Sequence, residues 1–327
     1  MDFFKNIILK KDVLGNAALI EQPGSLHIAF GIDANFTIGT GVLIYSILQH
    51  NTADFVFHIF TDNIYNSDIA RFRKLCQGYS NISIIIYHVN PENFSKLSTS
   101  FIWSQATYYR FIVNMYLNKL TSSVLYLDSD ILCINNFEKL FDKDFDNNIA
   151  MVVSDYPGMM TYAKKEFNLD TAFYFNAGFL YINLNEWQQQ DISQKAIDLS
   201  LKRNYKYYDQ DVLNILCSHK TIRLDKKYNT IYHLADMKED IDKGTIFLHY
   251  SGSVKPWQLW GQYHFLTPLW LKYKNASPWK DVPISRPSNY KQAKFMARMS
   301  RRNGKSLASL YWYAKYSVWK IYTKIKF

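Results

Sequence analysis

The chain has 327 residues, of which 48% are hydrophobic, so it is long enough to bury a large core and is predicted to be globular. Its three cysteines, Cys76, Cys133 and Cys217, are widely spaced and form no CxxC pair, which argues against a disulfide framework and a structural zinc site. A secretory leader pattern and an apolar stretch of about 18 residues are both missing, so we expect a protein that is neither exported nor transmembrane.

The net charge of +10 is concentrated at one end of the chain. Residues 282–327 hold eleven Lys or Arg and no Asp or Glu, which leaves 27 basic and 28 acidic residues in 1–281. The body is therefore close to neutral, and the excess of positive charge belongs to a C-terminal tail. A proline-spaced segment, 278–287, is predicted to link the two.

Apolar runs of strand length alternate with helical patterns along the body. Most runs lack polar alternation, which predicts strands covered on both faces, and helical spacing between them favours right-handed crossovers onto a parallel sheet. Ligands of such sheets lie beyond the carboxyl ends of the strands. The predicted strands are 26–32, 55–60, 82–89, 124–128, 149–155, 179–184, 221–224 and 245–251, and the predicted helices are 38–49, 67–78, 104–118, 188–203 and 209–218.

Two aspartates, Asp128 and Asp130, follow the apolar residues of "VLYLDSDILCI". The chain turns at a strand end, so both carboxylates can converge on one divalent cation that would cancel their repulsion. The alternative is that one of them caps the following turn. An aspartyl-phosphate hydrolase also begins from a strand that ends in DxD, but its motif requires Thr or Val where this chain has Leu132.

The stretch "HYSGSVKPW", residues 249–257, is the second place where the sequence indicates chemistry. His249 offers an imidazole suited to Mn²⁺, Gly252 lets the backbone approach an anion closely, and Lys255 offers a cation for phosphate. The stretch therefore predicts a joint site for a metal ion and a diphosphate. Alone, His249 is more often a hydrogen-bonded residue at a strand end, and Trp257 is more often a packing residue.

Six motifs in one order resemble the retaining glycosyltransferases of family 8, especially the lipopolysaccharide core glucosyl- and galactosyltransferases of Gram-negative bacteria. They are "AFGIDANF" (29–36), "YYRF" (108–111), "LYLDSDI" (125–131), "FNAGFLYINL" (175–184), "DQDVLN" (209–214) and "HYSGSVKPW". The resemblance implies an α/β protein with the GT-A fold, a Rossmann-like mixed, mainly parallel sheet flanked by helices, with a C-terminal helical basic and aromatic extension. It divides the chain into an N-terminal extension (1–25), a catalytic domain (26–281) and a tail (282–327).

The same resemblance implies a UDP-sugar donor, UDP-glucose or UDP-galactose, bound together with Mn²⁺ or Mg²⁺. The metal would neutralise the charge that grows on departing UDP. From the residues alone, Asp33 and Asn35 would serve equally as turn and helix-cap residues. The implied metal ligands are Asp128, Asp130 and His249, and the residues implied to bind the donor are Ala29, Asp33, Asn35, Arg110, Asp128, Ser129, Asn176, Ala177, Gly252 and Lys255.

Three residues are predicted to act on the transferred sugar. The resemblance implies that Asp209 binds the sugar hydroxyls and that Gln210 lies under the anomeric carbon, although Asp209 could instead be the N-cap of its helix. Asp155, at the end of "IAMVVSD", is a further candidate for the sugar pocket. Because glutamine is a feeble nucleophile, we expect front-side displacement, in which the acceptor hydroxyl attacks on the face that UDP leaves and the α configuration is retained.

Basic residues recur at helical spacing in the tail and are followed by tyrosines and tryptophans. This pattern indicates a helix on an anionic membrane surface. Nucleic acid is the rival partner, but the neutral body argues against it. We therefore expect a peripheral enzyme on the cytoplasmic face of the bacterial inner membrane that transfers a hexose to the outer core of lipopolysaccharide. The alternatives are a family 8 enzyme acting on a soluble or protein primer, a DxD-type phosphohydrolase, and a non-catalytic binding protein.

Overall fold

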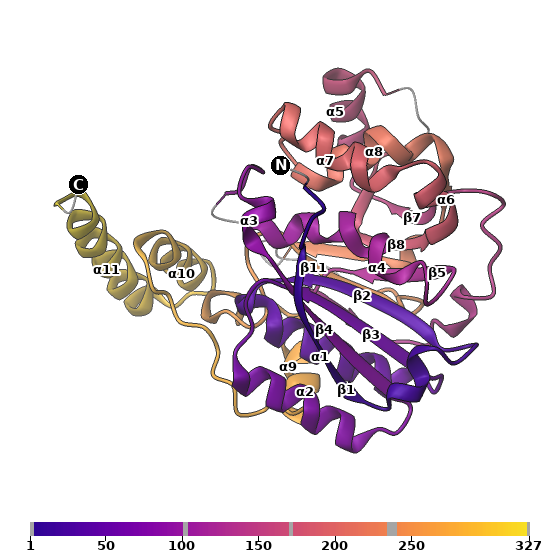
Figure 1. Ribbon diagram of the computed structural model, residues 1–327. Coiled ribbons are helices and arrows are strands. Elements are labelled where there is room, and N and C mark those ends of the chain that lie inside the picture. The colour runs from indigo at the N-terminus through magenta and orange to yellow at the C-terminus, as the bar shows by residue number, and fades with distance from the viewer. Residues whose placement is uncertain (1–2, 101–103, 170–172, 234–240, 326–327) are drawn as a thin grey trace. The chain divides into compact units, whose positions relative to one another are not determined.

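The computed structural model describes residues 3–100, 104–169, 173–233 and 241–325 (Figure 1). The chain forms two compact units, Met1–Thr230 with Asp242–Leu248, and Ile231–Ile241 with His249–Phe327. The three cysteines are free thiols, two of them buried. Among the described helices, none is both long and apolar enough to cross a membrane.

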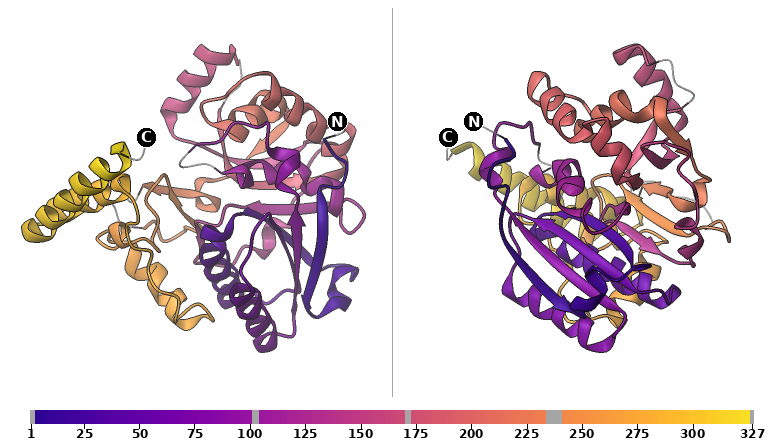
Figure 2. Two further views of the ribbon diagram at one scale, coloured as in Figure 1. Left: turned by 60° about the vertical axis from the view of Figure 1, so that its left-hand side comes forward. Right: turned by 45° about the vertical axis from the view of Figure 1, so that its right-hand side comes forward.

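Within the described residues, eight strands of the first unit form one twisted sheet in the order β1-β4-β3-β2-β5-β8-β7-β9 (Figure 2). Strands β4, β3, β2 and β5 pair in parallel, β8 is antiparallel to β5 and β7, and β7 and β9 are parallel. The sheet is therefore mixed and mainly parallel, as predicted. The bounds are β2 Leu26–Ile32, β3 Phe55–Thr61, β4 Ile82–Val89, β5 Ser123–Leu127, β7 Ala150–Ser154, β8 Phe175–Asn183 and β9 Thr221–Arg223.

Strand β1 (Ile8–Gly15) lies antiparallel to β4 at the edge of this sheet. Its sequence, ILKKDVLG, contains three consecutive charged residues that obscure the strand pattern, and most of its side chains are at least partly exposed. Charged side chains on an edge strand hinder pairing with another sheet. Segment 1–25 thus contributes a strand to the sheet, while the boundaries at 25 and 281 remain predictions.

Helices connect the strands largely where helical spacing predicts them. Helices α1 (Thr37–His50), α2 (Asn66–Gly78) and α8 (Tyr208–Cys217) match the predicted segments closely. The helix predicted over 188–203 is instead two helices, because Asp191 has a left-handed backbone with φ 52°. The others in the first unit are α3 Pro91–Phe94, α5 Pro157–Phe167, α6 Leu184–Gln189 and α7 Ile192–Lys202, with short 3₁₀ turns η1 Ala17–Ile20, η2 Ala34–Phe36, η4 Glu138–Leu140, η5 Ser218–Lys220 and η6 Lys226–Tyr228.

The helix predicted over 104–118 begins as a 3₁₀ helix, η3 (Gln105–Ile112), and ends as α4 (Val113–Leu117). Residues three apart lie in line in a 3₁₀ helix, which brings the rings of Tyr108 and Phe111 to a centroid distance of 5.8 Å. Both rings are buried in the core cluster that underlies the sheet. This packing anchors η3 against β2 and β3 and sets the position of Arg110.

A smaller sheet has the order β10-β11-β6, with β10 Thr230–His233, β11 Phe247–Ser251 and β6 Ile131–Cys133. The second unit also contains η7 (Leu259–Gly261) and helices α9 (Thr267–Ala276), α10 (Tyr290–Arg302) and α11 (Ser306–Ile325). Helices α10 and α11 lie side by side (Figures 1 and 2). The proline-spaced segment predicted as a linker is packed, because Trp279 is buried and Ser285 N–H donates to the Trp257 carbonyl.

Candidate active site

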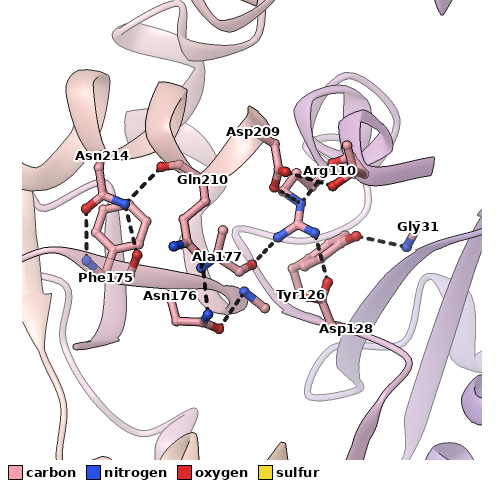
Figure 3. Close-up of polar contacts among 12 residues, drawn as sticks. Gly31, Arg110, Tyr126, Asp128, Phe175, Asn176, Ala177, Asp209, Gln210 and Asn214 are labelled. Carbon is pink, nitrogen blue, oxygen red and sulfur yellow. Dashed lines mark hydrogen bonds and ion pairs between the residues drawn. The ribbon is translucent and has the colours of Figure 1, made fainter. Parts of the chain in front are cut away.

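Arg110 is a buried cation held between two carboxylates (Figure 3). Its Nη2 lies 2.8 Å from Asp128 Oδ1, and its Nε lies 2.9 Å from Asp209 Oδ2. Nη1 donates to the carbonyl of Ala177, and the guanidinium carbon lies 4.6 Å from the ring centroid of Tyr126. Charge-assisted bonds of this kind offset the cost of burying the ions. Arg110 therefore joins the end of β5 to β8 and to the start of α8.

Burial and ion pairing act in opposite directions on this cluster. Burial raises the pKa of Asp209 to about 6, while Arg110 and the Thr107 hydroxyl, which donates to Asp209 Oδ1 at 2.7 Å, act to lower it. Burial also disfavours the charge on Arg110, but Asp128 and Asp209 together hold its pKa above the ordinary value. Arg110 therefore stays protonated, and with both carboxylates ionised the cluster has a negative net charge.

The alternative in which Asp209 is the N-cap of α8 is wrong. Asp209 lies within the first turn of the helix, and both of its oxygens are directed at Thr107 and Arg110. Asp211 accepts the Tyr207 backbone N–H instead, at 2.9 Å. Asp209 therefore does not cap the start of α8.

Asp128, Asp130 and His249 form the group predicted to hold a metal ion. One ligand atom from each lies within 4.8 Å of the others. The chain turns after β5, where Ile131 N–H donates to the Asp128 carbonyl at 3.2 Å, and the two carboxylates converge as expected. His249 lies on β11, in the same small sheet as β6. Two carboxylates and an imidazole are a donor set that fits a divalent cation such as Mn²⁺.

The side-chain amide of Gln210 is held at both ends. Its Nε2 donates to Asp155 Oδ2 at 2.8 Å, and its Oε1 accepts the Ala177 backbone N–H at 3.0 Å. Asn176 Nδ2 donates to Gln210 Oε1 at 3.1 Å and lies 3.3 Å from Asp155 Oδ2. Asn176 is held in turn by Asn229, whose Nδ2 donates to its Oδ1 at 3.0 Å. We call Asp155, Asn176, Ala177, Gln210 and Asn229 the amide network.

Helix α8 is attached to β8 and α5 by two buried polar residues, Asp211 and Asn214, which lie in the motif "DQDVLN" but for which the sequence alone predicts no role. Asn214 Oδ1 accepts the Phe175 N–H at 2.8 Å, and its Nδ2 donates to the Phe175 carbonyl at 2.9 Å, as a neighbouring strand would (Figure 3). Asp211 accepts the hydroxyls of Tyr174 at 2.5 Å and Tyr162 at 2.9 Å. These bonds fix the helix turn that carries Gln210.

The remaining predicted donor residues lie in separate surroundings. Asp33 accepts the Asn35 backbone N–H at 2.8 Å and caps η2, while Ala29 is fully buried within β2. In the second unit, Gly252 has φ 86°, and Lys255 Nζ donates to the Tyr250 carbonyl at 3.1 Å. Ser129 is buried in the turn between Asp128 and Asp130. The assignment of these residues to donor binding stays a prediction.

Gly31 and Tyr126 meet where strands β2 and β5 separate. The two strands pair only through Ile28 with Leu125 and Ala29 with Tyr126. Beyond that point the Gly31 N–H donates to the Tyr126 hydroxyl at 3.1 Å. A Cβ on residue 31 would lie 2.8 Å from that oxygen, so only glycine fits the motif here. A single tyrosine in an otherwise aliphatic strand is the signal that sequence reasoning missed.

Comparison with known proteins defines the class. The model of "Glycosyl transferase family 8" matches residues 27–261, and that of "Glycosyl transferase family 8 C-terminal" matches residues 267–320. The chain therefore belongs to glycosyltransferase family 8 and is a glycosyltransferase. This result sets aside the DxD-type phosphohydrolase and the non-catalytic binding protein.

Individual relatives indicate which members of the family the chain resembles. Lipopolysaccharide 1,3-galactosyltransferase of Salmonella typhimurium is 35% identical over 311 residues, 90% of this chain and 91% of that protein. Lipopolysaccharide glucosyltransferase WaaO of Escherichia coli K12 has the same identity and coverage. Among solved structures, galactosyltransferase LgtC with donor and acceptor sugar analogs has a TM-score of 0.64 at 24% identity, covering 77% of this chain and 96% of that one. The predicted GT-A fold is thereby confirmed.

Proposed function

We propose that the protein is a retaining α-glycosyltransferase that transfers glucose or galactose from a UDP-sugar to the outer-core oligosaccharide of lipopolysaccharide. The observation that carries the proposal is the close approach of Asp128, Asp130 and His249, with Asp128 also bound to Arg110. The relatives named as lipopolysaccharide galactosyl- and glucosyltransferases support the class of acceptor.

Asp128, Asp130 and His249 would hold Mn²⁺ or Mg²⁺, which supplies a Lewis acid against the charge that develops on the UDP leaving group. Arg110 orients the Asp128 carboxylate through its Nη2 and keeps one oxygen of that group engaged. The Gly252 amide and the Lys255 ammonium are the proposed further donors to the diphosphate. Ala29, Asp33 and Asn35 are proposed to contact the uridine.

The bonding of Gln210 supports front-side displacement. A carbonyl oxygen has two lone pairs, and Gln210 Oε1 already accepts from Ala177 N–H and Asn176 Nδ2. No lone pair remains for attack on the anomeric carbon in this arrangement. Gln210 therefore acts as a fixed surface beneath the sugar, and Asp209 accepts the sugar hydroxyls.

The exposed face of α11 supports attachment to an anionic membrane surface. Leu307, Leu310, Val318 and Ile321 are 84%, 65%, 49% and 58% exposed, and their spacing puts them on one side of the helix. The opposite side packs on α10, where Ser309 Oγ donates to the Ala297 carbonyl at 2.9 Å. With the basic residues of α10, this face would bind the cytoplasmic leaflet of the inner membrane peripherally.

A transfer assay with UDP-glucose and UDP-galactose on truncated core oligosaccharides tests the proposal. We expect an α-linked product from one donor, and Asp130→Ala should lower kcat by about a thousandfold or more, since the metal supplies several kcal/mol. Asp142→Ala, which removes an exposed carboxylate, is the control. Undiminished transfer by Asp130→Ala in the presence of a chelator would refute the scheme. Equal activity on a soluble primer would favour the alternative acceptor class.

A further inference from the structure

The first unit contains an open surface cavity of ≈ 490 Å³, and none of the residues assigned to the donor lines it. Seven of its eight lining residues are exposed. Its walls come from α5 and from the segment that links α7 to α8, which Figure 1 shows close together. This volume lies within the range of about 300–1,000 Å³ typical of small-molecule sites. The cavity is lined by Tyr162, Lys165 and Glu166 from α5 and by Arg203, Asn204 and Lys206 from the linking segment, among others.

The side chains that line the cavity carry a net positive charge. Three cations face one acid, Glu166, and within the described ranges no ion pair involves Lys165, Arg203 or Lys206. Two of the cations, Arg203 and Lys206, contact aromatic rings instead. A cation–π contact holds a cation in place without neutralising its charge. The Arg203 guanidinium lies 4.9 Å from the Tyr205 centroid, and Lys206 Nζ lies 5.1 Å from the centroids of Tyr162 and Tyr207.

The same two elements support the amide network. Tyr162, in the cavity wall, donates its hydroxyl to Asp211 Oδ2 at 2.9 Å, and Asp211 follows Gln210 directly. Helix α5 itself starts at Pro157, two residues after Asp155. The cavity is therefore connected through one hydrogen bond to the helix turn that positions Gln210. A ligand in the cavity would contact none of the residues of the amide network, because none of them lines it.

We infer that this cavity is a subsite for an anionic group, a phosphate or a carboxylate, on the acceptor oligosaccharide. The inference rests on the proposed function. A guanidinium offers two parallel N–H donors to either anion, Lys165 and Lys206 add point charges, and Asn204 adds an amide for a sugar hydroxyl. The acceptor's reacting hydroxyl lies at the amide network while a charged substituent of the same oligosaccharide occupies the cavity.

The double variant Arg203→Gln/Lys206→Gln tests the subsite, with Lys164→Gln/Lys202→Gln as the matched control. Both pairs remove two exposed cations from the same stretches of chain, but Lys164 and Lys202 do not line the cavity. The probes are a core oligosaccharide with its phosphates intact, the same compound after dephosphorylation, and the same compound after carboxyl reduction. Melting temperatures of both variants establish that the fold is retained.

For the intact oligosaccharide, we expect the cavity variant to raise KM about tenfold, with kcat within about twofold of the wild type. The control variant should match the wild type. The difference between variants should disappear on the dephosphorylated probe if the ligand is a phosphate, and on the carboxyl-reduced probe if it is a carboxylate. Equal KM values for both variants with every probe would overturn the subsite.

Calorimetric binding of the intact oligosaccharide separates this inference from the proposed function. The cavity variant should bind about tenfold more weakly than the control, whether or not sugar is transferred. If the wild type transfers no sugar but this difference in affinity persists, the proposed reaction fails and the subsite stands. Equal affinity of the two variants refutes the subsite, even where transfer proceeds.

Discussion

The Arg110 cluster and the α10–α11 helix pair differ in where their charges lie: the Arg110 charge is buried and paired with carboxylates, whereas most cations of the helix pair are exposed. Arg110 is only 4% exposed and contacts two carboxylates, two carbonyls and an aromatic ring. The helix pair lies in a segment with eleven basic residues and no acidic one, and most of these cations are exposed. Charge that is paired inside the fold is oriented for chemistry, whereas charge that is exposed on the surface is accessible to an external anion.

The strongest way to break this comparison is to remove the buried cation. Arg110→Gln leaves Asp128 and Asp209 without their counter-ion, which should cost about 3–5 kcal/mol of unfolding free energy and abolish transfer. Urea unfolding measures the cost. Lys226→Gln is the control, because its pair with Asp242 is 3.7 Å long and exposed, and its loss should cost less than about 1 kcal/mol. Similar costs for both variants would contradict the assignment.

Two buried histidines, His27 and His58, extend the comparison to buried groups that have no counter-ion among the described residues. Burial favours the neutral form of both imidazoles. His27 Nδ1 lies 2.9 Å from His58 Nε2, and His58 Nδ1 lies 3.0 Å from the Tyr87 hydroxyl. Burial lowers the pKa of His27 to about 4, and that of His58 well below its ordinary value of 6.5. Unfolding at acid pH lets both residues bind protons, so stability present above pH 6.5 is lost as pH falls.

For His27 alone, the loss between pH 7 and pH 4 should be on the order of 3 kcal/mol. Urea unfolding at several pH values measures this slope. His27→Gln removes one titrating group, so its stability should depend less steeply on pH. A wild-type stability that is flat over this range would show that the pair is charged or solvated in the folded chain.

A smaller effect is expected from the outer member of the amide network. Asn229→Ala removes one of the two donors to Asn176 Oδ1, while the Gly178 N–H still donates to it at 3.0 Å, so the change should cost about 1 kcal/mol. Because Asn176 also orients Gln210, kcat should fall about tenfold while KM for the donor changes less. Asn63→Ala, at an exposed site, is the control. An unchanged kcat would remove Asn229 from the network.

The smallest effect is expected at the exposed end of the comparison. Arg298→Gln on α10 should weaken partition onto anionic vesicles about fivefold, since one basic residue near such a surface contributes about 1 kcal/mol. Vesicle sedimentation measures this, and high salt should reduce the difference. Lys139→Gln, an exposed cation of the first unit, should leave partition unchanged. If Arg298→Gln and Lys139→Gln weakened vesicle binding equally, the attraction would depend on total charge and not on α10.

Sequence reasoning predicts the parallel strands well because they are continuous apolar runs between polar turns, and β2 and β4 have the predicted bounds. Strand β1 is missed because Lys10, Lys11 and Asp12 interrupt its pattern, which is tolerable only at a sheet edge. Three of the predicted site residues come together, Asp128 and Asp130 in the turn between β5 and β6 and His249 within β11.

The polar partners of the site are harder to foresee. Thr107 and Asn229 lie outside the six motifs, and nothing in their local sequence distinguishes them from surface residues. Their roles depend on which distant segment each one meets, Asp209 in one case and Asn176 in the other. Likewise, periodicity cannot tell that Asp211, and not Asp209, accepts the backbone N–H at the start of α8.

The hydrogen bond from the Gly31 N–H to the Tyr126 hydroxyl governs how strands β2 and β5 separate. The phenol takes the place of a backbone partner, so β2 and β5 can diverge without leaving a buried N–H unpaired. The spacing of these strand ends thus depends on one aromatic side chain and one missing Cβ. A side chain at residue 31 would displace the phenol and change the spacing of the two strand ends, while their paired residues keep their register.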